Sequence, residues 1–242
     1  MTDTTRMDRA LAAFGAALEA DAGMPCAAVL YGSAARGDWH ERLSDINLLL
    51  VVEDPSPPAL TRLATAVAAL HREGFTPPLI IGRDEWRRAT DVFPIEITDM
   101  QLSYRVLLGE DPVGDLAVRP ADLRSALESQ LRGKLVRLRQ AYVRFSDSMP
   151  TLGGFAATSG SELLVLMRSV AVLLGRDPGR DAEATLTAVA DHLGAEADAV
   201  RDVLLRRREP EWTCPAELFA RYLVAITHLA AAVDAHILPG DA

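Results

Sequence analysis

Several residue types are scarce in this chain, and each scarcity excludes a class of protein. The 242 residues include only two cysteines, Cys26 and Cys214, which lie far apart and form no CxxC or metal-ligand spacing. Neither a disulfide scaffold nor a cysteine metal site is therefore expected, and both thiols should be reduced. Lysine occurs once, at Lys134, and 34 acidic residues against 25 basic ones give a net charge of −9. Proteins that bind a long polyanion usually have a basic surface, so extended nucleic acid is not an expected partner.

The sequence also lacks a targeting signal and a membrane-spanning run. The first 20 residues are too acidic and too amphipathic for a signal peptide. No uninterrupted apolar run approaches the roughly 18 residues of a membrane span. We therefore expect a cytoplasmic protein with no membrane partner. Aromatic residues make up only 5%, whereas alanine and leucine are abundant, which favours helix.

Hydrophobic periodicity divides the chain into two parts. Before about residue 118, short apolar runs separated by helical patterns predict four strands, at 27–31, 45–52, 79–81 and 93–98. After it, the patterns predict only helices, at 123–145, 161–174, 181–193, 195–208 and 215–237, with a break at 151–154. The predicted fold class is α+β: a small mixed-sheet domain, residues 1–118, followed by an all-helical domain, residues 119–242.

The segment at 31–52, YGSAARGDWHERLSDINLLLVV, contains the pattern that bears most on function. Gly32-Ser33 ends the first predicted strand, and Asp45-Ile46-Asn47 opens the second about a dozen residues later. Side chains at positions i and i+2 of a strand point to the same face, so Asp45 and Asn47 are expected to lie together. Phosphoryl and nucleotidyl transfer depends on Mg²⁺, which prefers hard oxygen ligands of this kind.

Residues beside the first half of this pattern suit a phosphate group. Gly32 permits an unusual backbone angle and a close approach of the phosphate. Ser33 would begin a short helix whose free amides favour an anion, and Arg36 lies one turn further on. Ser44 is expected to shape the turn into the second strand.

A third acidic side chain is expected from PIEITDM at 94–100. If this segment is a regular strand, Glu96 and Asp99 lie on opposite faces. Ile95 and Ile97 share the apolar face, so Glu96 points the other way. Glu96 is therefore favoured as third metal ligand or general base, and Asp99 is the alternative.

On these motifs the N-terminal half resembles the nucleotidyltransferases of the DNA polymerase β superfamily, which have Gly-Ser and then Asp-x-Asp at this spacing. The two-part layout is similar to that of the aminoglycoside adenylyltransferases, in which a helical domain follows. PIEIT at 94–98 resembles their third-acid motif, and LLGEDP at 107–112 resembles the segment that leads out of their first domain. The resemblance is strong over 28–52 and moderate over 93–112, and it extends to the helical half only in general character.

The resemblance implies transfer of a nucleoside monophosphate from an NTP to a hydroxyl of a small-molecule or protein acceptor. It implies Mg²⁺ held by Asp45, Asn47 and Glu96. This chain departs from the family pattern at Asn47, where an amide without charge replaces the second aspartate. Three outcomes are open: a slow or single-metal enzyme, a site completed by another acid, or an inactive nucleotide-binding or regulatory, antitoxin-like protein that keeps the fold.

The predicted helix at 123–145 is the most basic part of the chain. Its cations, set against Glu128 alone, are Arg124, Arg132, Lys134, Arg137, Arg139 and Arg144. One interpretation is that one or two of them, Lys134 in particular, grip a triphosphate. The other is a solvated face that pairs with acidic neighbours. In the last predicted helix, Arg221 and His228 match the Arg-to-His spacing of the HEPN class of helical ribonucleases. The sequence leaves a homodimer open.

Overall fold

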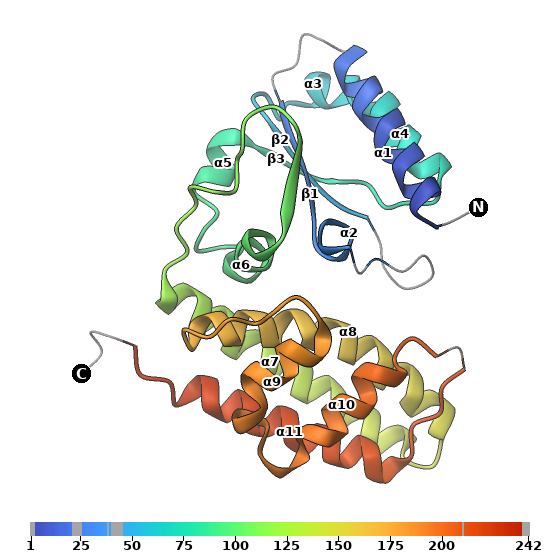
Figure 1. Cartoon of the computed structure of the whole chain (residues 1–242), viewed down its shortest axis with the longest axis vertical. Coiled ribbons are helices and arrows are strands. Elements are labelled where there is room, and N and C mark those ends of the chain that lie inside the picture. Colours follow the sequence, from blue (N-terminus) through green and yellow to red (C-terminus); the bar gives the residue numbers. More distant parts are fainter. Residues whose placement is uncertain (1–2, 21–25, 38, 40–45, 210, 239–242) are drawn as a thin grey trace. The chain divides into compact units, whose positions relative to one another are not determined.

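The computed structural model describes residues 3–20, 26–37, 39, 46–209 and 211–238. Ser44 and Asp45 therefore lie outside the described residues. The chain divides into two compact units, residues 1–117 and 118–242. Figure 1 labels the elements of both units.

A four-stranded mixed sheet organises the first unit. Its strands are β1 Cys26–Tyr31, β2 Asn47–Val52, β3 Leu79–Gly82 and β4 Tyr104–Leu108, in the order β3-β2-β1-β4. β1 is antiparallel to both β2 and β4, whereas β2 and β3 are parallel. The mixed sheet and the first three expected strands are confirmed over the described residues.

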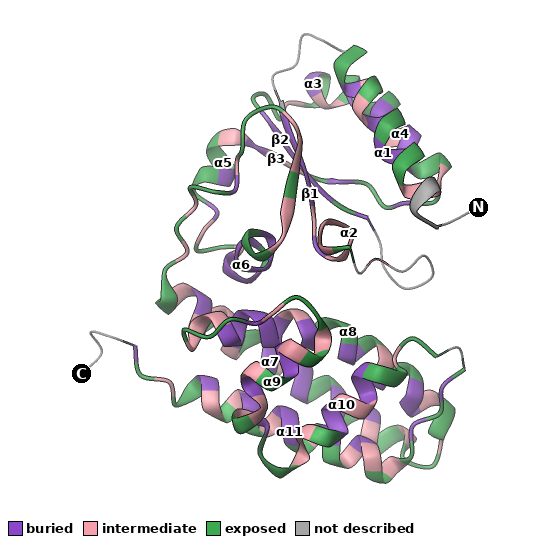
Figure 2. Ribbon diagram, in the orientation of Figure 1, coloured by how far each residue is buried: buried purple, intermediate pink, exposed green. Residues whose placement is uncertain are grey.

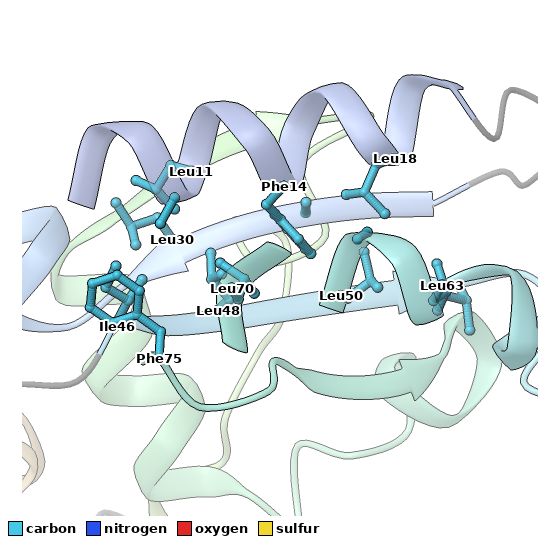
Figure 3. Packing of buried hydrophobic residues seen from close by; sticks show 14 residues of the cluster. Leu11, Phe14, Leu18, Leu30, Ile46, Leu48, Leu50, Leu63, Leu70 and Phe75 are labelled. Carbon is cyan, nitrogen blue, oxygen red and sulfur yellow. The ribbon is translucent and has the colours of Figure 1, made fainter. Parts of the chain in front are cut away.

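One face of the sheet is covered by α1, Asp3–Ala20, and α4, Ala64–Arg72 (Figures 1 and 3). Phe14 of α1 and Leu70 of α4 pack with Leu30, Leu48 and Leu50 of the sheet in one buried cluster. Because side chains alternate along a strand, the positions at 47, 49 and 51 point to the opposite face. Three further short helices connect successive strands along the chain: α2 Ser33–Arg36, α3 Pro57–Arg62 and α5 Arg83–Arg87.

The expected strand at 93–98 is wrong, because these residues form the start of α6, Pro94–Leu102. Proline is well suited to the first helical turn, where its fixed φ is helical and its missing N–H is not needed. The helix buries residues on most of its circumference, so the sequence shows neither a clean helical stripe nor a true strand alternation. The fourth strand is β4, which begins about ten residues after the expected one at a half-buried sheet edge.

In the part of 118–242 that the structure describes, the regular elements are all helical. They are α7 Pro120–Phe145, α8 Met149–Leu173, α9 Ala182–Leu193, a 3₁₀ turn at Gly194–Glu196, α10 Ala197–Arg206 and α11 Ala216–Asp234. Figure 2 shows their buried stripes in purple, and α8 contributes the largest buried share of its residues. The inner face of α7 is lined by leucines, among them Leu127, Leu131 and Leu138.

The expected break at 151–154 is also wrong, since α8 runs through both glycines. Gly153 is required by packing: a Cβ placed there would lie 2.0 Å from the carbonyl oxygen of Trp212. The chain around Trp212 crosses the helix at this point, and the amide of Cys214 donates to the carbonyl of Met149. The sequence shows the glycine but not the segment that approaches it.

Two helices of the described chain, α8 and α11, are long and apolar enough to cross a membrane by length and composition alone. About 61% of the apolar window of α8 and 33% of that of α11 are buried inside the protein. A core helix passes the same test, so the finding is weak evidence. The expectation that the protein has no membrane partner stays a prediction.

Candidate functional site

The candidate site lies where β1 ends and β2 begins. The antiparallel register places Tyr31 opposite Asn47 on one side and opposite Tyr104 on the other. Directly opposed residues in a sheet project to the same face, so these three side chains form a row at the end of the sheet. The row stands on the face opposite to the core beneath α1 and α4, and the Gly32-Ser33 turn follows it directly.

Gly32 and Asn47 are in close contact. Gly32 has φ +72° and ψ −147°, a backbone conformation that is essentially restricted to glycine. A Cβ at this position would lie 2.9 Å from Nδ2 of Asn47. Glycine is therefore required by its backbone angles, and a Cβ here would also displace the end of the Asn47 side chain. Asn47 is the exposed residue of β2, and the next five residues are buried, so the strand leaves the core at the site.

The helix α2 begins at Ser33, as expected, and is only four residues long. Its last residue, Arg36, directs its guanidinium toward α6. Nη1 of Arg36 lies 3.9 Å from Oδ2 of Asp99, and both side chains are about 10% exposed. This ion pair connects the turn after β1 to the helix that replaces the expected strand.

The two acids of the PIEITDM segment lie on the same side of α6. On a helix, residues three apart are neighbours, whereas a strand would have separated them. Burial raises the pKa of Tyr31, and the negative charges of Glu96 and then Asp99 add to the increase. Both carboxylates therefore act on the phenol that stands beside Asn47. They differ in access, because Glu96 is exposed and Asp99 is buried against Arg36.

Of the residues predicted from the sequence, the structure places Asn47 against Gly32, which precedes Ser33 and the helix of Arg36, and Glu96 near enough to raise the pKa of Tyr31. Asp99, the alternative acid, belongs to the same group. Tyr31 was missed by the sequence reasoning. Its position directly before Gly32, at the end of a strand, was the available signal.

The donors at this site have the chemistry that Mg²⁺ prefers. Asn47 offers an amide oxygen and Glu96 a carboxylate, both hard ligands. Among the described residues, no group of three or more His, Cys, Asp or Glu side chains is arranged to hold a metal ion. Asp45, the principal ligand expected from the sequence, lies outside that search. The donor types therefore fit Mg²⁺, and the metal role of the three residues stays a prediction.

Lys134 is held inside the helical unit. Its side chain is 4% exposed, and Nζ lies 2.6 Å from Oε2 of Glu162 and 3.5 Å from the carbonyl oxygen of Ser159. Burial lowers the pKa of Lys134, and the ion pair with Glu162 opposes that shift. The amine is thus buried and already paired, which favours a structural role for Lys134 over phosphate binding.

Three further residues that the sequence singled out in the helical unit, Arg132, Arg221 and His228, also have partners. Arg132 pairs with Glu128 and with Asp234. Nε of Arg221 donates to Glu196 at 2.6 Å, and Nδ1 of His228 lies 3.3 Å from the carbonyl oxygen of Leu193. These contacts connect Arg221 and His228 of α11 to the 3₁₀ turn and to the end of α9, which favours a structural role for both residues.

No family model matches this chain, and no curated protein matches it at a significant level.

Proposed function

We propose that residues 1–117 form a nucleotidyltransferase-type domain that binds an NTP at the end of β1 and β2. It would transfer the nucleoside monophosphate to a hydroxyl of a small-molecule or protein acceptor. The observation that supports this proposal is the contact between Gly32 and Asn47. It joins the two halves of a motif that lie fifteen residues apart in the sequence, as the resemblance to the nucleotidyltransferase superfamily requires.

The residues of the candidate site have distinct proposed roles. Asn47 offers an oxygen ligand at the start of β2, and Asp45 is the principal metal ligand that the resemblance implies. These residues and Glu96 would hold Mg²⁺, which would supply positive charge against the phosphates. Glu96 is the better general base of the two acids because it is exposed, whereas Asp99 is engaged by Arg36. Ser33 and Ser44 would contact the phosphates from the two turns.

A second candidate function is nucleotide binding without transfer, in a regulatory or antitoxin-like protein. The amide of Asn47 favours it, since a neutral ligand offsets less of the charge on a metal ion than a carboxylate does. The pairing of Asp99 with Arg36 favours it too, because that carboxylate already faces a cation. Both functions require NTP binding, and they differ in turnover.

The experiment compares wild type with Asn47→Asp by calorimetric titration of ATP, GTP, CTP and UTP, with and without Mg²⁺. We expect wild type to bind at least one NTP, and Asn47→Asp to strengthen the Mg²⁺-dependent component about tenfold, or 1.4 kcal/mol. Gln130→Glu is the matched control, because it makes the same amide-to-carboxylate change at an exposed position of α7. Transfer of labelled nucleotide to hydroxyl acceptors then separates the two candidate functions.

Asn47 can be observed directly because it is the only asparagine in the chain. Protein labelled with [¹⁵N]asparagine gives one side-chain amide signal in a proton–nitrogen correlation spectrum, and Mg²⁺ with NTP should shift it. If neither wild type nor Asn47→Asp binds any NTP, the domain is not a nucleotide-binding domain and both candidate functions are rejected.

A further inference from the structure

The outward face of the C-terminal half of α7 has an apolar middle and basic sides. Val136 is 52% exposed and Val143 is 83% exposed. They are seven residues apart, which places them on one face about 10 Å apart along the helix. At 100° per residue, arginines flank this pair on both sides. We call the whole set the α7 ridge: Val136, Val143, Arg132 and Arg139 on one side, and Arg137 and Arg144 on the other.

The charge of the ridge is largely uncompensated. No acidic residue occurs between Glu128 and Asp147. Arg132 pairs with Glu128 and Asp234, but within the described parts of the chain Arg137, Arg139 and Arg144 form no ion pair. A set of free cations on one helix face is unusual in a protein of net charge −9.

Part of the ridge is held in place before any partner binds. The guanidinium of Arg144 lies over the ring of Phe145, 5.0 Å from its centroid. Phe145 in turn stacks on Phe155 of α8, with the centroids 5.7 Å apart. A restrained guanidinium loses less conformational entropy when it pairs with an anion.

The two valines do not belong to the hydrophobic core of the helical unit, which α7 contacts through its opposite face. The opposite face of α7 packs through Leu127, Leu131 and Leu138. An exposed valine is a weaker helix former than the alanine, glutamine or arginine that commonly occupies such a position, and it gains nothing from packing there. One exposed valine needs no explanation, but two that are seven residues apart and lined by four arginines form a pattern.

We propose that the α7 ridge docks an amphipathic helix of a partner protein, whose narrow apolar seam is flanked by Asp or Glu. Val136 and Val143 occupy the same position of successive heptads, and the arginines beside them lie where flanking charges choose the partner in helix pairing. The four flanking cations are all arginine, whose planar fork binds carboxylates bidentately. This interaction is independent of nucleotide binding by residues 1–117.

Other occupants fit the ridge less well. A second copy that paired α7 with α7 would oppose arginine to arginine, which is repulsive. A membrane-surface helix needs a broad apolar face, and this seam is narrow. A long polyanion would be repelled by the rest of an acidic chain, whereas a short acidic helix contacts the ridge alone.

The test uses the full chain and a synthetic helix of about three heptads with leucine at the seam and glutamate on both flanks. Binding is measured by fluorescence anisotropy. We expect saturable binding that weakens as salt rises, and that falls at least about tenfold in Val136→Ser/Val143→Ser. Leu205→Ser is the matched control, since Leu205 is 66% exposed on α10 and should leave binding unchanged. Circular dichroism confirms that each variant is folded.

A charge swap makes the test specific. Arg137→Glu/Arg144→Glu should weaken binding of the glutamate-flanked helix. It should strengthen binding of a helix that keeps glutamate on the flank facing Arg132 and Arg139 and has lysine on the flank facing positions 137 and 144. The proposal is overturned if the wild-type chain does not bind the acidic helix, or if the valine and leucine variants weaken binding equally. It is also overturned if sedimentation shows self-association through the ridge, or if anionic phospholipid vesicles bind wild type and displace the peptide.

Discussion

A single contact, between Gly32 and the amide of Asn47, determines the shape of the candidate site. It explains why the turn after β1 needs glycine and why a larger residue there would displace the side chain expected to bind metal. Asn47 itself has two properties that matter: it is exposed, and it has no charge. The first keeps the site accessible, and the second reduces its attraction for a cation.

We expect Gly32→Ala to lower the free energy of unfolding by about 3 kcal/mol, since its backbone angles are nearly restricted to glycine and the new Cβ meets Asn47. Gly37 offers the comparison. It also has a positive φ, +86°, but no atom lies within 4 Å of a Cβ placed there. Gly37→Ala should therefore cost only about 1 kcal/mol.

Urea denaturation measures both costs, and the single asparagine side-chain signal reports on the site. That signal should shift in Gly32→Ala and stay in place in Gly37→Ala. If the two variants lose equal free energy of unfolding and the asparagine signal does not shift in Gly32→Ala, the contact with Asn47 does not contribute to the structure.

At the scale of elements, the sequence predicted the strands that consist of short apolar runs. The strands β1, β2 and β3 are short apolar runs, and their ends are marked by Gly32, Pro55 and Gly82. The segment that became α6 could not be predicted this way, because a helix buried around most of its surface has no amphipathic stripe. That error also misplaced the acids, since a strand separates Glu96 from Asp99 and a helix brings them together.

The glycine pair in α8 shows a second limit of local patterns. Two adjacent glycines usually indicate a break, yet here one of them admits the chain around Trp212. Which glycine has that role depends on a segment about 60 residues later, so no local rule reveals it. The candidate site has the same character: Gly32 and Asn47 were predictable from a motif, but the Tyr31 row and the Arg36–Asp99 pair follow from strand register and from α6.

Opposite effects are expected from the two glycines of α8. Gly153→Ala places a Cβ 2.0 Å from the carbonyl oxygen of Trp212 and should destabilise the protein by about 3 kcal/mol or more. Gly154→Ala meets no atom within 4 Å, and it replaces a flexible residue in a helix interior. It should stabilise the protein by up to about 1 kcal/mol. Thermal unfolding followed by circular dichroism would show whether each variant is more or less stable than wild type. A loss of stability in both variants would contradict this packing.

At the scale of the molecule, the chain divides between residues 117 and 118, next to the point where strand patterns end in the sequence. The first unit buries apolar residues beneath α1 and α4, and the second buries them among its helices. The helical core also contains charge. Lys134 lies within it, Glu162 pairs with its amine, and Ser159 hydrogen-bonds to the hydroxyl of Tyr222. The sequence showed that Lys134 was the only lysine but not that it was buried.

The pair of Lys134 and Glu162 gives the molecule a pH-dependent stability that can be measured. The two partners are unequal, because the lysine side chain is 4% exposed and that of glutamate is 55% exposed. Glu162→Gln leaves a buried ammonium without its counter-charge, which should cost about 3 kcal/mol at neutral pH. Glu128→Gln is the control, since it changes an exposed i, i+4 pair of α7 and should have little effect.

The cost of Glu162→Gln should decrease as the pH rises toward 10. Burial already lowers the pKa of Lys134, and loss of the carboxylate lowers that pKa further in the folded state only. Between this lowered value and the ordinary pKa of lysine, the unfolded chain binds more protons than the folded one, so stability increases with pH. Urea denaturation of both variants at pH 7 and pH 9.5 measures the difference. A cost that is unchanged between the two pH values would mean that loss of Glu162 does not lower the pKa of Lys134 into this range.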